Sequence, residues 1–148
     1  MTEKTAKEYL NSISHYRSKA LSKISQILEL RAIAESCTVS PDKENVQTSG
    51  SGDKMASIVG RIVDLENEIL AAYEIYNKRK NILTEITNEM GENRESQFLT
   101  YRYINNFGLY DTFFEMGVSD TTGKRIFRKS IAEFTKRYNE KQQKNHSD

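Results

Sequence analysis

The chain has 148 residues and a formal net charge of +1; charged residues make up 29% and hydrophobic residues 36%. Seven glycines, one proline and no tryptophan are typical of a helix-rich protein and argue against a β-rich one. No stretch approaches about 18 consecutive apolar residues, and the polar N-terminus lacks the apolar core of a signal peptide, so we expect a cytoplasmic all-α protein without a membrane partner.

Residues 5–36 are predicted to form the first amphipathic helix. Apolar side chains recur there at three- and four-residue steps, which places them on one helix face. They are Tyr9, Ile13, Tyr16, Ala20, Ile24, Ile27 and Ala34.

Residues 37–54 are predicted to form a loop. They contain the only proline, a Gly-Ser-Gly segment and a run of small polar residues. Asp53 is the expected N-cap of the next helix, since a carboxylate there satisfies free backbone N–H groups.

Residues 54–90 have the most regular pattern in the chain and predict a second long helix. One apolar set repeats every seven residues, and a second set follows three residues after it, which is the a/d pattern of a coiled coil. The first set is Met55, Ile62, Ile69, Tyr76, Leu83 and Met90, and the second is Ile58, Leu65, Ala72, Ile86 and the polar exception Arg79. The first helix, folded back antiparallel, could be the partner, and so could a second copy of the chain; Ile62 and Ile69 are expected to be buried.

Shorter elements are predicted after residue 90. Gly91 is expected to end the long helix, because glycine adopts the left-handed conformation without strain. A short helix within 96–106 is broken at Phe107–Gly108, a second follows over 109–116, and Gly117 forms a turn. A final helix runs from about residue 119 to residue 141. We therefore predict two parts: a helical hairpin or coiled coil over 1–90, and a helix-turn-helix module over 91–148.

Basic charge is concentrated near the C-terminus. Residues 38–90 hold six Lys/Arg and nine Asp/Glu, a balance of −3, whereas residues 121–144 hold eight Lys/Arg and two Glu, a balance of +6. The distribution of charge says more about partners than the net charge does. It directs attention to the last predicted helix.

The segment EMGVSDTTGKRIFRKSI, residues 115–131, has the parts of a helix-turn-helix. Gly117 suits a left-handed turn, Ser119 is a favoured N-cap, and Asp120 suits the positive end of the helix dipole. The helix that follows has a polar, basic face opposite its apolar positions, as a DNA-reading helix needs.

The same segment resembles the helix-turn-helix of ArpU-like phage transcriptional regulators, which are similar to sigma-factor region 4. The matching residues are Gly117, Val118, Ser119, Asp120, Thr121, Thr122, Arg125, Ile126, Arg128, Lys129, Ser130 and Ile131. The segments KEYLNSI and VQTSGSGDKMASIVGRIVDLENEI resemble a phage and prophage family that joins an N-terminal helical pair to such a module. The resemblance implies a phage-encoded, DNA-binding regulator in a bacterial host cell. It also suggests contact with RNA polymerase or another protein.

The predicted DNA-binding residues lie on the last helix. They are Thr121, Thr122, Lys124, Arg125, Arg128, Lys129 and Lys136. Arg125 is expected to read a base, although pairing with Asp111 is an alternative left open. Gly123 departs from the family, which has an aromatic or β-branched residue there. It is expected to weaken the helix by about 1 kcal/mol relative to alanine and to leave out a packing side chain.

No catalytic pattern is recognised. The single cysteine, Cys37, and the two histidines, His15 and His146, are too far apart in sequence to predict a metal site. The Gly-Ser-Gly segment lacks the lysine of a phosphate-binding loop. We expect a non-enzymatic protein without a cofactor. A coiled-coil protein that binds a host or phage protein is the alternative to a DNA-binding regulator.

Overall fold

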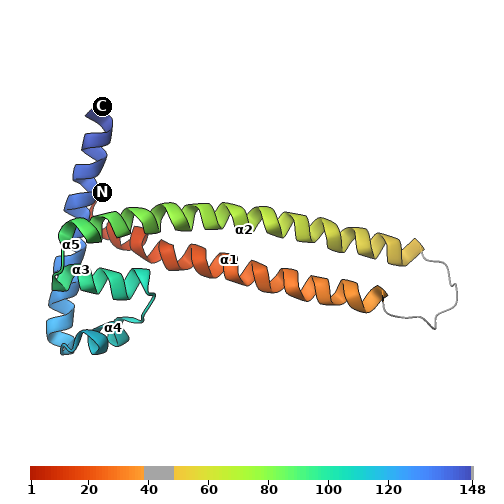
Figure 1. The fold of residues 1–148 in the computed structure, drawn as a ribbon, viewed down its shortest axis with the longest axis horizontal. Coiled ribbons are helices and arrows are strands. Elements are labelled where there is room, and N and C mark those ends of the chain that lie inside the picture. Colours follow the sequence, from red (N-terminus) through yellow and green to blue (C-terminus); the bar gives the residue numbers. More distant parts are fainter. Residues whose placement is uncertain (39–48, 148) are drawn as a thin grey trace. The chain divides into compact units, whose positions relative to one another are not determined.

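The computed structural model describes residues 1–38 and 49–147, which contain helices and no strand, so the all-α prediction is confirmed. The helices are α1 (Glu3–Thr38), α2 (Ser49–Met90), α3 (Arg94–Leu99), the π-helix η1 (Thr100–Ile104), α4 (Leu109–Met116) and α5 (Asp120–Ser147) (Figure 1). Within the described part, none of the helices is long and apolar enough to cross a membrane.

The helices α1 and α2 pack side by side as an antiparallel hairpin, as predicted (Figure 1). The expected loop over 37–54 is too long, because α2 already begins at Ser49. Gly52 and Asp53 therefore lie inside the helix, and Asp53 is not its N-cap. Extending an existing helix costs little, since each added residue brings its own hydrogen bond. Residues 39–48 lie outside the described residues.

The chain divides into two compact units. One contains residues 1–15 and 75–148, and the other residues 16–74. The sequence placed a boundary at residue 90 instead. The N-terminal part of α1 and the C-terminal part of α2 belong to the first unit because their side chains contribute to its core. That core consists of Ala6, Leu10, Ile13, Leu83, Ile86, Met90, Phe98, Leu99, Tyr103, Phe113, Ile126, Ile131 and Phe134.

In the unit formed by 16–74, the a and d positions of α2, which form its seam with α1, are buried unevenly. Ile58, Leu65 and Ala72 are buried, whereas Ile62 and Ile69 are only half-buried. The prediction that these last two are buried is wrong for the single chain. One antiparallel partner helix covers one side of the apolar stripe and leaves the other side accessible.

Arg79, the polar exception in the heptad pattern, has partners from α1. Its guanidinium donates a hydrogen bond to the Ser12 hydroxyl and lies 4.9 Å from the centre of the Tyr9 ring. Burial, and to a smaller extent the charge of Tyr138, raise the pKa of Tyr9 to about 12. The arginine therefore keeps its polar contacts inside an otherwise apolar seam.

The segment before α4 is held by local contacts. Gly91 has a φ of 79° and ends α2 as predicted. The Arg102 Nη1 donates to the Phe107 carbonyl at 3.0 Å, and Tyr101 stacks on Phe107 with ring centres 5.6 Å apart. These contacts lead the chain from the π-helix into α4.

Candidate nucleic-acid interface

The turn between α4 and α5 has the left-handed glycine and the serine cap that the sequence predicted. Gly117 has a φ of 66°, and its N–H donates to the Phe114 carbonyl at 3.0 Å. The Val118 N–H donates to the Phe113 carbonyl at 3.1 Å, which completes the C-terminal cap of α4. The Ser119 hydroxyl accepts a hydrogen bond from the Thr122 N–H at 3.3 Å and caps α5.

α5 packs closely on α4 at Gly123. A Cβ atom placed there would lie 2.5 Å from the Phe113 ring. Phe113 is fully buried and also contacts Phe98, with 6.3 Å between ring centres. The expectation that Gly123 leaves a packing position empty is therefore wrong: the Phe113 ring occupies that space, and the missing side chain allows the two helices to fit together.

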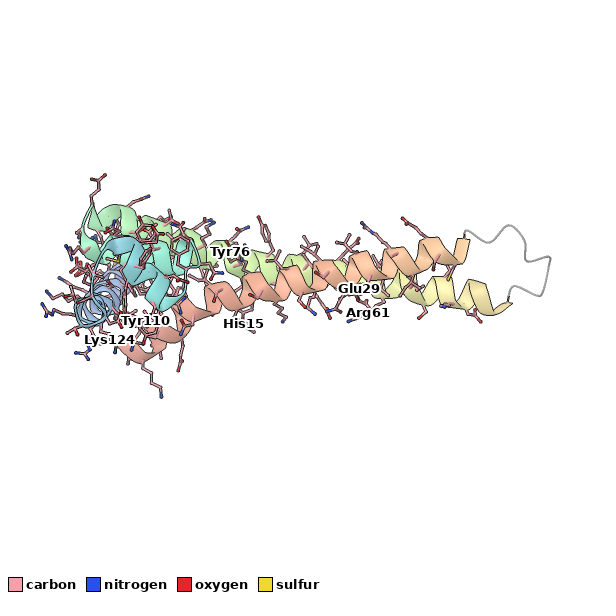
Figure 2. All side chains as sticks on the ribbon, turned by 90° about the horizontal axis from the view of Figure 1, so that it is seen from below. His15, Glu29, Arg61, Tyr76, Tyr110 and Lys124 are labelled. Atoms are coloured by element: carbon pink, nitrogen blue, oxygen red, sulfur yellow. The ribbon has the colours of Figure 1, made fainter. Side chains whose placement is uncertain are left out.

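The predicted DNA-binding residues lie mainly on the exposed face of α5. Thr122 alone is half-buried, at the edge of that face. The exposed residues are Thr121, Lys124, Arg125, Arg128, Lys129 and Lys136. Lys124 is labelled in Figure 2. Thr121, Arg125, Arg128 and Lys136 follow one another at spacings that keep them on one side of a helix. Lys129 and Lys136 also line a shallow groove with Glu95 and Glu133.

Two cations of α5, Arg137 and Lys141, form ion pairs with glutamates. Arg137 Nε lies 2.6 Å from Glu133 Oε1, and Lys141 Nζ lies 2.5 Å from Glu89 Oε1 and 3.7 Å from Glu85 Oε2. The hydrogen bond from Lys141 lowers the pKa of Glu89 below its usual value.

The five cations of the exposed face differ from Arg137 and Lys141. Within the part of the chain that the structure describes, none of Lys124, Arg125, Arg128, Lys129 and Lys136 has an acid within ion-pair distance. The pairing of Arg125 with Asp111 is not observed.

Helix α4 adds features that the sequence interpretation missed. Tyr110, labelled in Figure 2, and Phe114 are 59% and 83% exposed. Their spacing of four residues, each one position after the inward Leu109 and Phe113, is a signal that was available in the sequence. Asp111 and Glu115 on α4 and Asp120 on α5 are exposed as well, so acidic groups lie close to the start of α5 in sequence.

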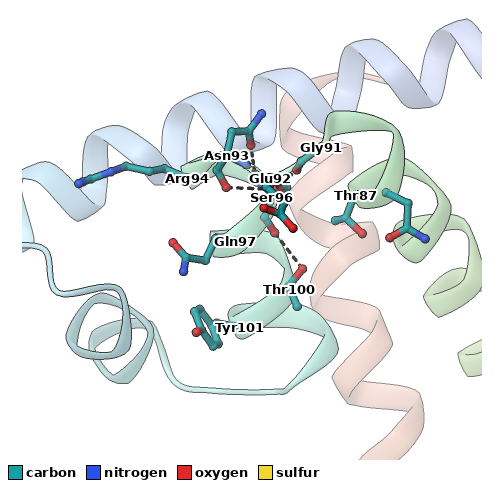
Figure 3. Close-up of a pocket in the computed structure, with 10 residues that line it drawn as sticks. Thr87, Gly91, Glu92, Asn93, Arg94, Ser96, Gln97, Thr100 and Tyr101 are labelled. Carbon is teal, nitrogen blue, oxygen red and sulfur yellow. Dashed lines mark hydrogen bonds between the residues drawn. The ribbon is translucent and has the colours of Figure 1, made fainter.

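A separate pocket lies where α2 turns into α3 (Figure 3). Its polar groups are largely used by the cap of α3: the Ser96 N–H donates to Asn93 Oδ1 at 2.8 Å, and the Ser96 hydroxyl donates to the Gly91 carbonyl at 2.6 Å. Thr100 Oγ1 donates to the Ser96 carbonyl at 2.9 Å. These bonds stabilise the turn, so we assign the pocket a structural role.

The described residues contain no group of three or more His, Cys, Asp or Glu side chains that could hold a metal ion. The exposed basic face of α5 is the candidate site. Comparison of the chain with models of known protein families, with curated proteins and with solved structures gave no match.

Proposed function

We propose that the protein binds double-stranded DNA through α5 and acts as a phage-encoded transcriptional regulator in the cytoplasm of a bacterial host. One observation carries the proposal: five cations that have no acidic partner among the described residues lie on the exposed face of a helix that follows a left-handed glycine turn. Phosphates supply the negative charge that such a face lacks. The resemblance of residues 117–131 to phage regulators supports the same function.

The position of each side chain along α5 suggests its role. Thr121, Thr122 and Arg125 belong to the first two turns, the part of a recognition helix that reaches base edges in the major groove. Lys129 and Lys136 lie further along and are better placed for phosphates, which position a protein without specifying sequence. The exposed Tyr110 and Phe114 on α4 are candidates for a contact with RNA polymerase or another protein.

The salt dependence of binding tests this proposal. If the five cations neutralise about five phosphates, log affinity for duplex DNA falls with log salt at a slope of roughly −4 to −5 per chain. Fluorescence anisotropy of a labelled duplex over a range of salt concentrations measures the slope. A slope near zero, or no binding at low salt, would contradict the proposal.

A second function is suggested by the apolar surface of the hairpin. Eight of the eleven exposed large hydrophobic side chains of the described residues lie within residues 16–74. Such a surface suits a coiled-coil interaction protein that binds a host or phage protein. In that case the hairpin alone carries the activity, and replacing Lys124, Arg125, Arg128 and Lys129 with alanine leaves it intact.

A further inference from the structure

Seven exposed apolar side chains of the unit formed by 16–74 share one position relative to the seam. Here the seam means the line of residues along which α1 and α2 contact each other. Six of the seven side chains directly follow a residue of that line, as Leu21 follows Ala20. The seventh, Ile24, lies four residues after Ala20. We call them the apolar flank: Leu21, Ile24 and Leu28 on α1, and Val59, Val63, Leu70 and Tyr73 on α2. Their exposed fractions range from 41% for Ile24 to 66% for Leu70.

Both rows of the apolar flank lie on the same side of the hairpin. One residue along a helix is a rotation of about 100° in a fixed sense, seen from the N-terminus. Two antiparallel helices that face each other are related by a two-fold axis perpendicular to the plane that contains them. Residues rotated by the same angle from the line of contact therefore lie on the same side of that plane in both helices.

The ion pairs support this placement. Arg31 lies four residues after Ile27, as Ile24 does after Ala20, and its Nη2 lies 3.8 Å from Glu66 Oε1 across the hairpin. Lys23 and Glu68 are rotated from the seam in the opposite sense, and Lys23 Nζ lies 2.7 Å from Glu68 Oε2. The Arg31–Glu66 pair therefore lies on the side of the hairpin that carries the apolar flank, and the Lys23–Glu68 pair lies on the opposite side.

The size of the apolar flank fits a stable interface. At the exposed fractions given, its seven side chains present roughly 700 Å² of surface, close to the ~800 Å² that each partner contributes to a specific complex. The half-buried Ile62 and Ile69 lie between the apolar flank and the buried seam. A covering pair of helices would bury them and complete the a positions of the heptad pattern.

We propose that a second copy of the chain covers the apolar flank, so that two hairpins form a four-helix bundle in which they point in the same direction. In this arrangement the two-fold axis that relates the copies is parallel to the helices. Helix α1 of each copy then packs against α2 of the other. The dimer does not depend on the proposed DNA binding, and its test needs no DNA.

Charge selects this direction. The exposed charged residues beside the apolar flank are Arg17, Arg31 and Glu35 on α1, a balance of +1, and Asp53, Glu66 and Glu74 on α2, a balance of −3; Arg31 and Glu66 also pair with each other within one hairpin. With the hairpins pointing the same way, α1 of one copy, with its positive balance, faces α2 of the other, with its negative balance. Hairpins pointing in opposite directions would set α1 against α1 and α2 against α2, so that the acidic residues of the two α2 helices face each other, which is unfavourable.

Sedimentation velocity of the full chain tests the dimer. We expect the parent to sediment as a dimer at micromolar concentration. Leu70→Lys is expected to raise the dissociation constant at least about tenfold, because it places a charge in the centre of each contact. Ile33→Lys is the matched control: Ile33 is 43% exposed but lies on the side of the hairpin opposite the apolar flank, so this variant stays dimeric. A monomeric parent, or equal weakening by both substitutions, would overturn the proposal.

Disulfide cross-linking tests the direction. In a Cys37→Ser background, Leu28→Cys and Val63→Cys chains are mixed and oxidised. Leu28 of one copy lies at nearly the same height as Val63 of the other in the proposed bundle, so the mixture gives a covalent dimer of unlike chains. Cross-linking of the Leu28→Cys chain with itself, and not in the mixed combination, would show the opposite direction and overturn the proposal.

Discussion

Gly123→Ala destabilises the protein by about 2 kcal/mol, although alanine is the better helix former. Alanine in an exposed helix position is favoured over glycine by about 1 kcal/mol. At residue 123, however, the new Cβ would lie 2.5 Å from the Phe113 ring, and that ring is fully buried and packs against Phe98 in the core. Overpacking of this kind costs about 1–3 kcal/mol, which outweighs the gain from the higher helix propensity of alanine. Chemical denaturation measures the difference.

Gly60→Ala is the matched control for this substitution. Gly60 is an exposed helical glycine of α2, and nothing lies within 4 Å of a Cβ placed there. Gly60→Ala should stabilise the protein by about 0.4–1 kcal/mol, an effect opposite in sign to that of Gly123→Ala. In a Phe113→Leu background the cost of Gly123→Ala should shrink, because the smaller side chain leaves room. Stabilisation by Gly123→Ala in the parent would contradict the packing of α4 on α5.

Leu65→Asp is expected to cost several kcal/mol and to unfold the hairpin of residues 16–74. Leu65 is fully buried against α1, and truncating such a leucine to alanine already costs about 2–5 kcal/mol. Aspartate adds a carboxylate that must be desolvated without a partner or become protonated. Circular dichroism melts and limited proteolysis follow the loss of helix.

Asn67→Asp introduces the same charge two residues away on the exposed side of α2. Its melting temperature should stay close to that of the parent, since an isolated surface substitution is usually within about 0.5 kcal/mol. If Leu65→Asp melts like Asn67→Asp, the antiparallel seam between α1 and α2 is wrong.

Local signals in the sequence were sufficient for most of the helices. The seven-residue repeat predicted α2, and Gly117 with Ser119 predicted the turn and the cap of α5. These features depend on the backbone preferences of single residues or on a regular spacing, both of which can be read along one chain. The exposure of the basic residues on α5 follows from the same periodicity.

Features that depend on distant residues could not be predicted. The role of Gly123 depends on where the Phe113 ring lies, and propensity alone gave the wrong conclusion. The a/d pattern could not reveal that Leu65 is buried while Ile69 is half-buried, because that depends on how many helices surround α2. The Gly-Ser-Gly segment predicted a loop by composition, yet the helix begins at Ser49.

Selection of duplexes from a random library by the purified full chain, followed by binding of variants to the selected duplex, tests the proposed DNA reading most directly. Arg125 can donate two hydrogen bonds to a guanine, a contact that contributes about 1–3 kcal/mol of discrimination. We predict that one defined sequence is enriched, that Arg125→Ala loses the preference for it over a scrambled duplex, and that Lys136→Ala weakens binding to both equally. No enriched sequence, or equal losses on the two duplexes for Arg125→Ala, would contradict base reading by α5.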